Sequence, residues 1–146
     1  MNATTENLDI IILGKDSDKL KELKHVLYTL SLPHALLCFA RTSQLDTYLE
    51  KKQRKAIVFL PMAGSLNARL AAVISKLRHY PQMSIAVYDC TGLLSNVEDV
   101  FAMGANIYIH KPVDRTDLTK AVRQVMRINA QFYSGHLNRE TYFLSA

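Results

Sequence analysis

Three charged residues of this sequence stand shortly after apolar runs, where their side chains could act together. Lys15, Asp89 and Lys111 each follow a run of Ile, Leu, Val or Tyr residues. If they converge on one crevice, the Asp89 carboxylate can accept hydrogen bonds from both ammonium groups, and partial burial strengthens such a pair. The alternative is three unrelated charges that point to water, where an ion pair contributes only about 0–1 kcal/mol. The sequence is compatible with both arrangements.

A comparable position after another apolar run, Ala56–Leu60, holds Pro61, which has neither a nucleophile nor a metal ligand. His110 is expected to be a rim residue and not a base, because no nucleophilic Ser or Cys with an orienting partner can be assigned near it. Cys38 and Cys90 adjoin apolar runs and are expected to be buried, reduced thiols. We therefore expect no catalysis, no metal and no cofactor.

Strand-like and helical segments alternate along the chain and must position these residues. Each expected strand is followed by a segment with apolar residues at helical spacing, as in Leu20, Leu23, Leu27 and Leu30. Five strands that alternate with five helices through short loops require right-handed crossovers. The sequence thus predicts a doubly wound α/β fold of the flavodoxin-like type, with a five-stranded parallel sheet between two helical layers. The expected strands are Leu8–Leu13, Ala35–Phe39, Ala56–Leu60, Ser84–Tyr88 and Ile107–Ile109.

The expected helices begin and end at recognisable residues. Asp16 or Ser17 can cap the first helix and Thr42 or Ser43 the second. The third carries Leu70, Val73, Ile74 and Leu77, the fourth spans about Leu94–Met103 before Gly104, and Asp114 or Thr116 caps the last. In such a fold, ligands bind beyond the carboxyl ends of the strands. The candidate site there comprises Gly14, Lys15, Asp16, Pro61, Met62, Asp89, Cys90, Thr91, His110, Lys111 and Pro112.

The stretch Met103–Pro112, with the sequence MGANIYIHKP, resembles the Gly-Ala, strand and Lys-Pro signature of the receiver domains of two-component response regulators. The resemblance extends from about Leu8 to Ile128, and Tyr108 matches an aromatic residue of that family. In the family, two acids after the first strand hold magnesium and an aspartate after the third is phosphorylated. A Ser or Thr after the fourth strand senses the phosphate, and the lysine contacts it.

Carried over position by position, the resemblance implies that this chain has lost most of that pocket. The acid pair falls on Gly14 and Lys15, with Asp16 one residue beyond. The phosphoacceptor falls on Pro61, the switch hydroxyl falls on Asp89, and only the lysine, Lys111, is retained. The chain thus resembles a degenerate receiver, or pseudo-receiver, in which fixed charges replace metal and phosphate.

This resemblance implies an atypical cytoplasmic receiver of bacterial two-component (phosphorelay) signalling that works by phosphorylation-independent contact with a protein. The implied partner is a sensor kinase, another regulator or a second copy, and we expect no nucleic-acid or membrane partner. One alternative is a functional receiver with a shifted acceptor, for which Asp16 is the available acid. Another is a flavodoxin-like binder of a small ligand, although no Gly-rich phosphate loop follows the first strand.

Two further features of the resemblance concern switching and dimerisation. Tyr108 is either an aromatic that swings between inward and outward positions, as in the family, or a half-buried strand residue with its hydroxyl at the rim. The acids Glu98 and Asp99 and a basic stripe of Lys120, Arg123 and Arg127 could meet across a two-fold dimer built from the fourth helix, fifth strand and fifth helix. A solvated surface with weak ion pairs is the alternative.

The length of 146 residues and the net charge of +5 fit one domain, with residues 8–128 forming the receiver-like unit. Residues 1–7 are polar and expected to be disordered. No apolar run is long enough to span a bilayer. The carboxyl-terminal segment, residues 129–146, is too apolar for a solvated linker, since it holds Phe132, Tyr133, Tyr142, Phe143 and Leu144. It either packs on the domain or a partner, or extends the last helix and frays.

Overall fold

The computed structural model describes residues 8–14, 18–30, 35–51, 55–62, 68–80, 83–89, 96–110, 114–131 and 139–145. Its strands are β1 (Leu8–Leu13), β2 (Ala35–Phe39), β3 (Lys55–Met62), β4 (Met83–Asp89), β5 (Ile107–His110) and β6 (Phe143–Ser145). Its helices are α1 (Asp18–Thr29), α2 (Thr42–Lys51), α3 (Ala68–Leu77), α4 (Asn96–Met103), α5 (Arg115–Gln131) and α6 (Arg139–Tyr142). The expected disordered residues 1–7 lie outside the described part.

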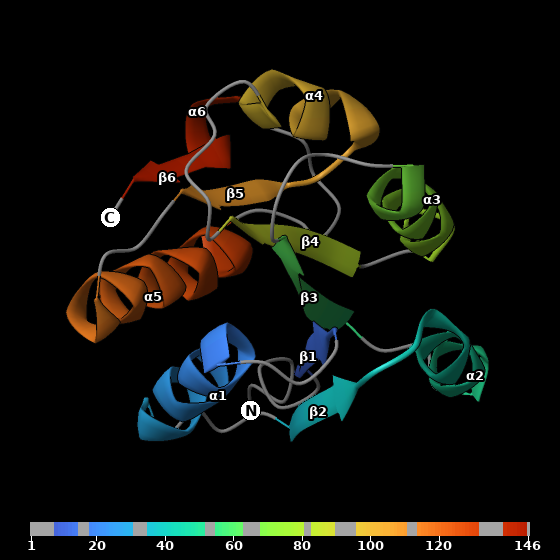
Figure 1. Cartoon of the computed structure of the whole chain (residues 1–146), viewed down its shortest axis with the longest axis horizontal. Helices are drawn as coiled ribbons and strands as arrows, with labels where there is room; N and C mark the ends of the chain where they lie inside the picture. The colour runs from blue at the N-terminus through green and yellow to red at the C-terminus, as the bar shows by residue number, and fades with distance from the viewer. Residues whose placement is uncertain are drawn as a thin grey trace.

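The strands form one parallel sheet in the order β2-β1-β3-β4-β5-β6, with helices on both faces (Figure 1). Helices α1 and α5 pack on one face, where Leu23 and Val122 belong to one apolar core. Helices α2, α3 and α4 cover the other face, where Leu45, Ile74 and Val100 belong to the second core. The strand β1 is buried along its whole length because both faces are covered. The predicted α/β class with a parallel, helix-covered sheet is confirmed.

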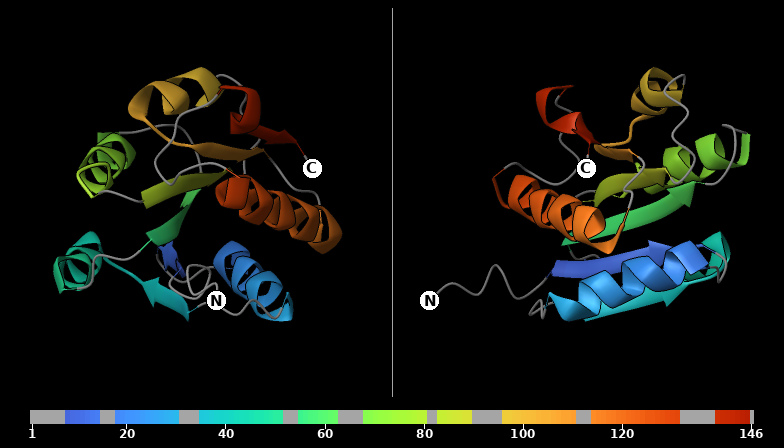
Figure 2. Two further views of the ribbon diagram at one scale, coloured as in Figure 1. Left: turned by 180° about the vertical axis from the view of Figure 1, so that it is seen from behind. Right: turned by 60° about the vertical axis from the view of Figure 1, so that its left-hand side comes forward.

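The sheet has six strands, so the prediction of five was wrong. Strand β6 pairs in parallel with β5 through Tyr108↔Phe143, Ile109↔Leu144 and His110↔Ser145. It lies at the sheet edge beside α6 and near the carboxyl terminus, as both views of Figure 2 show. Three residues are too few for a recognisable period-2 pattern. Tyr142 and Leu144 of the carboxyl-terminal segment are buried, which agrees with packing of these two residues on the domain. Phe132 and Tyr133 lie outside the described residues.

Strand β3 also differs from the prediction, since it continues through Pro61 to Met62. The register of β1 with β3 ends at Ile12↔Phe59, whereas β3 and β4 remain paired as far as Met62↔Asp89. At Pro61, β3 is therefore paired with β4 on one side, whereas its described pairing with β1 on the other side has already ended. This is the kind of position at which a strand tolerates proline, which cannot donate a backbone hydrogen bond.

The turn that leads from α4 into β5 is held by contacts of Gly104 and Asn106. Gly104 has a φ of 110°, a left-handed value that favours glycine. Its carbonyl accepts a 3.2 Å hydrogen bond from Arg78 at the end of α3. Asn106 Oδ1 accepts a 2.8 Å bond from the Ile85 amide, and the Asn106 amide donates to the Ile85 carbonyl at 2.9 Å. The predicted helix end at Gly104 is confirmed, and the turn aligns β5 with β4.

Two smaller expectations concern Asp114 and Cys38. Asp114 caps α5, because its Oδ1 accepts a 2.9 Å bond from the Asp117 amide. The expectation that Cys38 is buried was wrong: it lies on the edge strand β2 and is exposed. Cys90 lies outside the described residues. Within the described helices, none has the length and apolar character needed to cross a membrane.

Candidate functional site

The described part of the candidate site lies at the carboxyl ends of β1, β3, β4 and β5. The parallel register places Asp89, the last residue of β4, level with Met62 on β3 and His110 on β5. Because side chains alternate between the faces of a sheet, Asp89, His110 and Tyr108 belong to the same face. It is the face that α2, α3 and α4 cover, because Tyr108 belongs to their core.

Gly14 and Pro61 are neighbours in space, as expected for two residues at the ends of adjacent strands. A Cβ atom built on Gly14 would lie 3.5 Å from Pro61 Cδ and 3.4 Å from Leu20 Cδ1. The Gly14 amide donates a 2.9 Å hydrogen bond to the Phe39 carbonyl. In the receiver pattern these positions carry an acid and the phosphoacceptor. Here a glycine and a pyrrolidine ring meet, and neither supplies a carboxylate.

Asp89 and Tyr108 form the main polar contact of the site. The Tyr108 hydroxyl donates a hydrogen bond to Asp89 Oδ2, and both residues are 0% exposed. Burial raises the pKa of Tyr108 above its usual range, and the hydrogen bond to Asp89 raises it further. The phenol therefore stays a neutral donor at physiological pH. Of the two alternatives for Tyr108, the structure has the ring fully inward, with its hydroxyl away from the rim.

The expected cluster of Lys15, Asp89 and Lys111 remains a prediction, because both lysines lie outside the described residues, as does Asp16. Sequence reasoning missed the contact between Asp89 and Tyr108. The signal that could have found it is the parallel register together with the side-chain alternation, which brings two residues of neighbouring strands to the same face.

His110 also lies in this region and is partly buried. Its ring is 6.4 Å from the Tyr108 ring and 5.4 Å from the Phe143 ring, measured between centroids. Its Nε2 is buried and has no hydrogen-bond partner among the described residues. The expectation of a rim residue therefore holds only for part of the side chain, since β6 covers some of it.

The described residues do not fit a magnesium site. No group of three His, Cys, Asp or Glu side chains that could hold a metal occurs within the described ranges. At the carboxyl ends of the described strands, the available carboxyl group is that of Asp89. One of its oxygens already accepts a hydrogen bond from the Tyr108 hydroxyl. Magnesium demands several oxygen ligands in near-octahedral geometry, usually with one or two carboxylates.

Comparison with solved structures gives the fold. The chain is similar to the isolated receiver domain of RcsB from Salmonella enterica serovar Typhimurium, with a TM-score of 0.64, 18% identity, and coverage of 83% of this chain and 89% of that one. The chain has the receiver fold. Response regulator RPA3017 in red light signaling of R. palustris gives a TM-score of 0.64 at 18% identity, covering 82% and 92%. The chemotaxis response regulator CheY4 of Vibrio cholerae gives 0.63 at 12% identity, covering 82% and 98%.

Sequence comparison adds no relative to these receiver structures. No protein-family model matches the chain, and no curated protein matches it in sequence. Structural matches at identities below 25% establish the arrangement of strands and helices. The chemistry of the site has to be argued from its own residues.

The dimer expected through α4, β5 and α5 remains a prediction, and contacts within the chain bear on it. Lys120, Arg123 and Arg127 are exposed along α5, as predicted, and Glu98 and Asp99 are exposed on α4. However, Glu98 pairs with Arg139 of the chain's own α6, at 2.7 Å. The outer edge of the fifth strand is also covered by β6. A second protomer would therefore not meet a free β5 edge or a free Glu98.

Proposed function

We propose that this chain is an atypical receiver of bacterial two-component signalling, that it acts in the cytoplasm through contact with a signalling protein, and that it is neither phosphorylated nor an enzyme. The observation that carries the proposal is the buried hydrogen bond from Tyr108 to Asp89. In the receiver pattern, the position of Asp89 holds a hydroxyl that senses the phosphate, and the aromatic moves with it. Here the Asp89 side chain holds the aromatic inward without any phosphate.

The residues at the acceptor position support this proposal. Phosphoryl transfer depends on a positioned nucleophile and on neutralisation of the charge that develops during transfer. Strand β3 contains no carboxylate between Lys55 and Met62, and Pro61 packs beside Gly14 at its end. A slip of one position in the alignment would place Leu60 or Met62 there, and neither accepts a phosphoryl group.

A fixed inward Tyr108 has a functional consequence. A receiver that switches must keep both positions of the aromatic close in free energy, so that phosphorylation can shift the population. A buried hydrogen bond stabilises one position throughout. We therefore propose that Tyr108 and β5 hold a single conformation, independent of phosphorylation, which the partner, a sensor kinase or another regulator, recognises.

The test is incubation of the full chain with acetyl phosphate and Mg²⁺, followed by intact-mass measurement. The receiver domain of RcsB, treated in parallel, is the control for a competent reaction. We expect no phosphoryl adduct on this chain. A stoichiometric adduct would contradict the proposal, and its loss in Asp16→Asn would then favour the alternative of a shifted acceptor.

A further inference from the structure

Residues 139–145, near the carboxyl terminus, contact the rest of the protein much as a bound peptide would. We call this segment the tail and the surface under it, formed by α4 and β5, the tail face. The tail folds into the short helix α6 and the strand β6, which lie against α4 and β5 respectively (Figure 1). Its contacts with the tail face are of three chemical kinds.

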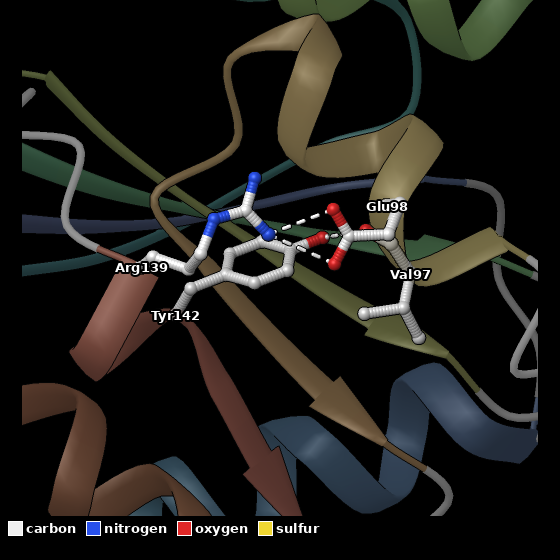
Figure 3. A network of polar contacts seen from close by, with 4 residues as sticks. All are labelled: Val97, Glu98, Arg139 and Tyr142. Carbon is white, nitrogen blue, oxygen red and sulfur yellow. Dashed lines mark hydrogen bonds and ion pairs between the residues drawn. The ribbon is translucent and has the colours of Figure 1, made fainter.

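The first contact is ionic. Arg139 Nη1 donates to both carboxylate oxygens of Glu98, at 2.7 and 2.9 Å (Figure 3). The guanidinium carbon also lies 4.3 Å from the centre of the Phe101 ring on α4, within the range of a cation–π contact. Glu98 and Arg139 side chains are 71% and 61% exposed, so water screens their attraction. The ion pair therefore selects a basic residue but does not hold the tail firmly.

The second contact is an aromatic anchor. Tyr142 is 2% exposed, and its ring meets Phe101 edge-on at 4.8 Å and lies 5.9 Å from Tyr108. Its hydroxyl donates a 2.6 Å hydrogen bond to the carbonyl of Val97 in the first turn of α4 (Figure 3). A buried aromatic ring with a satisfied hydroxyl is the typical anchor of a protein interface.

The third contact is strand addition. Without β6, the outer edge of β5 would present free N–H and C=O groups, which readily pair with another strand. Tail residues Phe143 to Ser145 pair with that edge. Addition of an extended segment to a sheet edge is a general mode of peptide recognition, in which the main chain gives affinity and the side chains give specificity.

We infer that the tail face is a binding site for a protein segment, that the chain's own tail fills it in the isolated protein, and that a signalling partner engages it by replacing the tail. The partner segment carries a basic residue for Glu98, a tyrosine for the space between Phe101 and Tyr108, and an extended run that adds a strand to β5. This inference rests on the proposed function in one respect: it takes the protein to act through a signalling partner.

Asp99 indicates that a partner can bind more favourably than the tail. It neighbours Glu98 on α4, is exposed, and forms no ion pair with any described residue. The tail has one cation, Arg139, and uses it on Glu98. A partner segment with two basic residues would complement both acids, which helps it compete with a tail whose tethering gives it an effective concentration of about millimolar.

The test uses the full chain and a fluorescent peptide, RETYFLSA, which has the sequence of residues 139–146. The release variant is Arg139→Ala/Tyr142→Ala, which weakens the tail in place. We expect it to bind the peptide at least about tenfold more tightly than the wild type, because the tethered competitor is weakened. Glu98→Ala in the release variant should reduce binding, whereas Asp99→Ala should not. A peptide with tyrosine replaced by alanine is the matched ligand control.

A second peptide tests the partner chemistry. The same sequence with an additional N-terminal lysine should bind the release variant more tightly than RETYFLSA, and Asp99→Ala should remove that gain. Circular dichroism establishes that the release variant is folded. Should it not fold, hydrogen exchange of the wild type is the substitute: added peptide in excess should leave β5 amides protected while it exposes those of Phe143 and Leu144.

Three results of the peptide experiments would overturn the inference. They are equal peptide affinity of wild type and release variant, no binding by the folded release variant, and no response of exchange to the peptide in the wild type. A wild-type dimer that becomes monomeric in the release variant, measured by sedimentation, would identify a second copy's tail as the occupant and would also overturn it. If a phosphoryl adduct forms and the release variant still binds the peptide, only the proposed function is overturned. If no adduct forms and the release variant does not bind the peptide, only this inference is overturned.

Discussion

The hydroxyl of Tyr108 on β5 donates a hydrogen bond to the carboxylate of Asp89 on β4, and neither residue is exposed to solvent. A buried carboxylate is costly unless hydrogen bonds compensate for the water that it loses. A buried phenol likewise needs an acceptor for its hydroxyl. Each group thus supplies what the other requires, and the pair links β4 to β5 at the end of the sheet where receivers hold phosphate.

The substitution Tyr108→Phe should lower the free energy of unfolding by about 1.5–3 kcal/mol. It removes the donor from a buried acceptor, the Asp89 carboxyl group, while the ring can remain in place. Urea denaturation followed by circular dichroism measures the change. Tyr28→Phe is the matched control, because Tyr28 is 70% exposed on α1 and its loss of a hydroxyl should change stability by less than about 0.5 kcal/mol. Equal effects of the two substitutions would contradict a stabilising role for the contact with Asp89.

Stability should decrease at alkaline pH, and Tyr108 should account for part of the decrease. Burial and the bond to Asp89 raise the pKa of Tyr108, and burial with the nearby Glu98 raises that of Tyr142. A group whose pKa is raised on folding stabilises the protein fully below its unfolded pKa, about 10 for tyrosine. That contribution is lost as the pH rises from there towards the folded pKa, because the unfolded chain ionises first.

The measurement is the midpoint of urea unfolding at pH values on both sides of the unfolded tyrosine pKa. The wild type should lose stability more steeply than Tyr108→Phe or Tyr142→Phe, since each variant lacks one of the buried phenols. Identical pH dependence in the wild type and both variants would show that these phenols ionise as readily in the folded protein as in the unfolded chain.

Much of the fold could be predicted from the sequence because each element carries a local signal. The apolar run Leu8–Leu13 and the cap at Asp114 or Thr116 depend on nearby residues only; the structure has the strand as predicted and the cap at Asp114. The extension of β3 through Pro61 was missed, because it depends on β1 ending its pairing earlier. Strand β6 was missed because its pairing with β5 is a contact of tertiary structure.

The site was less predictable than the fold, because its contacts depend on tertiary structure and not on nearby residues. Sequence position indicated that Gly14, Pro61 and Asp89 gather at one end of the sheet, and the contact of a Gly14 Cβ position with Pro61 agrees with this. The partner of Asp89 could not be read from residue types alone, since the hydrogen bond depends on the face to which Tyr108 points. The pairing of Arg139 with Glu98 depends on the path of the tail, which local patterns do not determine.

Gly104→Ala should destabilise the protein by at least about 1–2 kcal/mol. At its φ of 110° a Cβ atom is strained, and the atom would also lie 2.2 Å from Arg78 Nη1 and 2.4 Å from Arg78 Cδ. Arg78 would have to move, which would break its bond to the Gly104 carbonyl. Thermal and urea unfolding measure the loss.

Gly14→Ala is the matched control for this substitution. A Cβ atom on Gly14 would make ordinary contacts of 3.4–3.7 Å with Leu20 and Pro61. Gly14→Ala should therefore change stability by less than about 1 kcal/mol, since alanine also restricts the unfolded chain. A larger loss in Gly14→Ala than in Gly104→Ala would mean that the packing around Pro61, and not the turn before β5, limits stability.

Substitutions in the tail should distinguish the contribution of the aromatic anchor, Tyr142, from that of the ion pair of Arg139. Tyr142→Ala removes a buried ring and should raise hydrogen exchange at Phe143 and Leu144 strongly, because β6 is short and opens locally once its anchor is lost. Arg139→Ala removes an exposed ion pair and should cost only about 0–1 kcal/mol. Exchange at β1 amides should be unchanged in both variants, since β1 lies across the sheet from the tail. If Tyr142→Ala accelerated exchange equally in β1 and β6, the tail would be an integral part of the folding core, and a partner could not replace it without unfolding the domain.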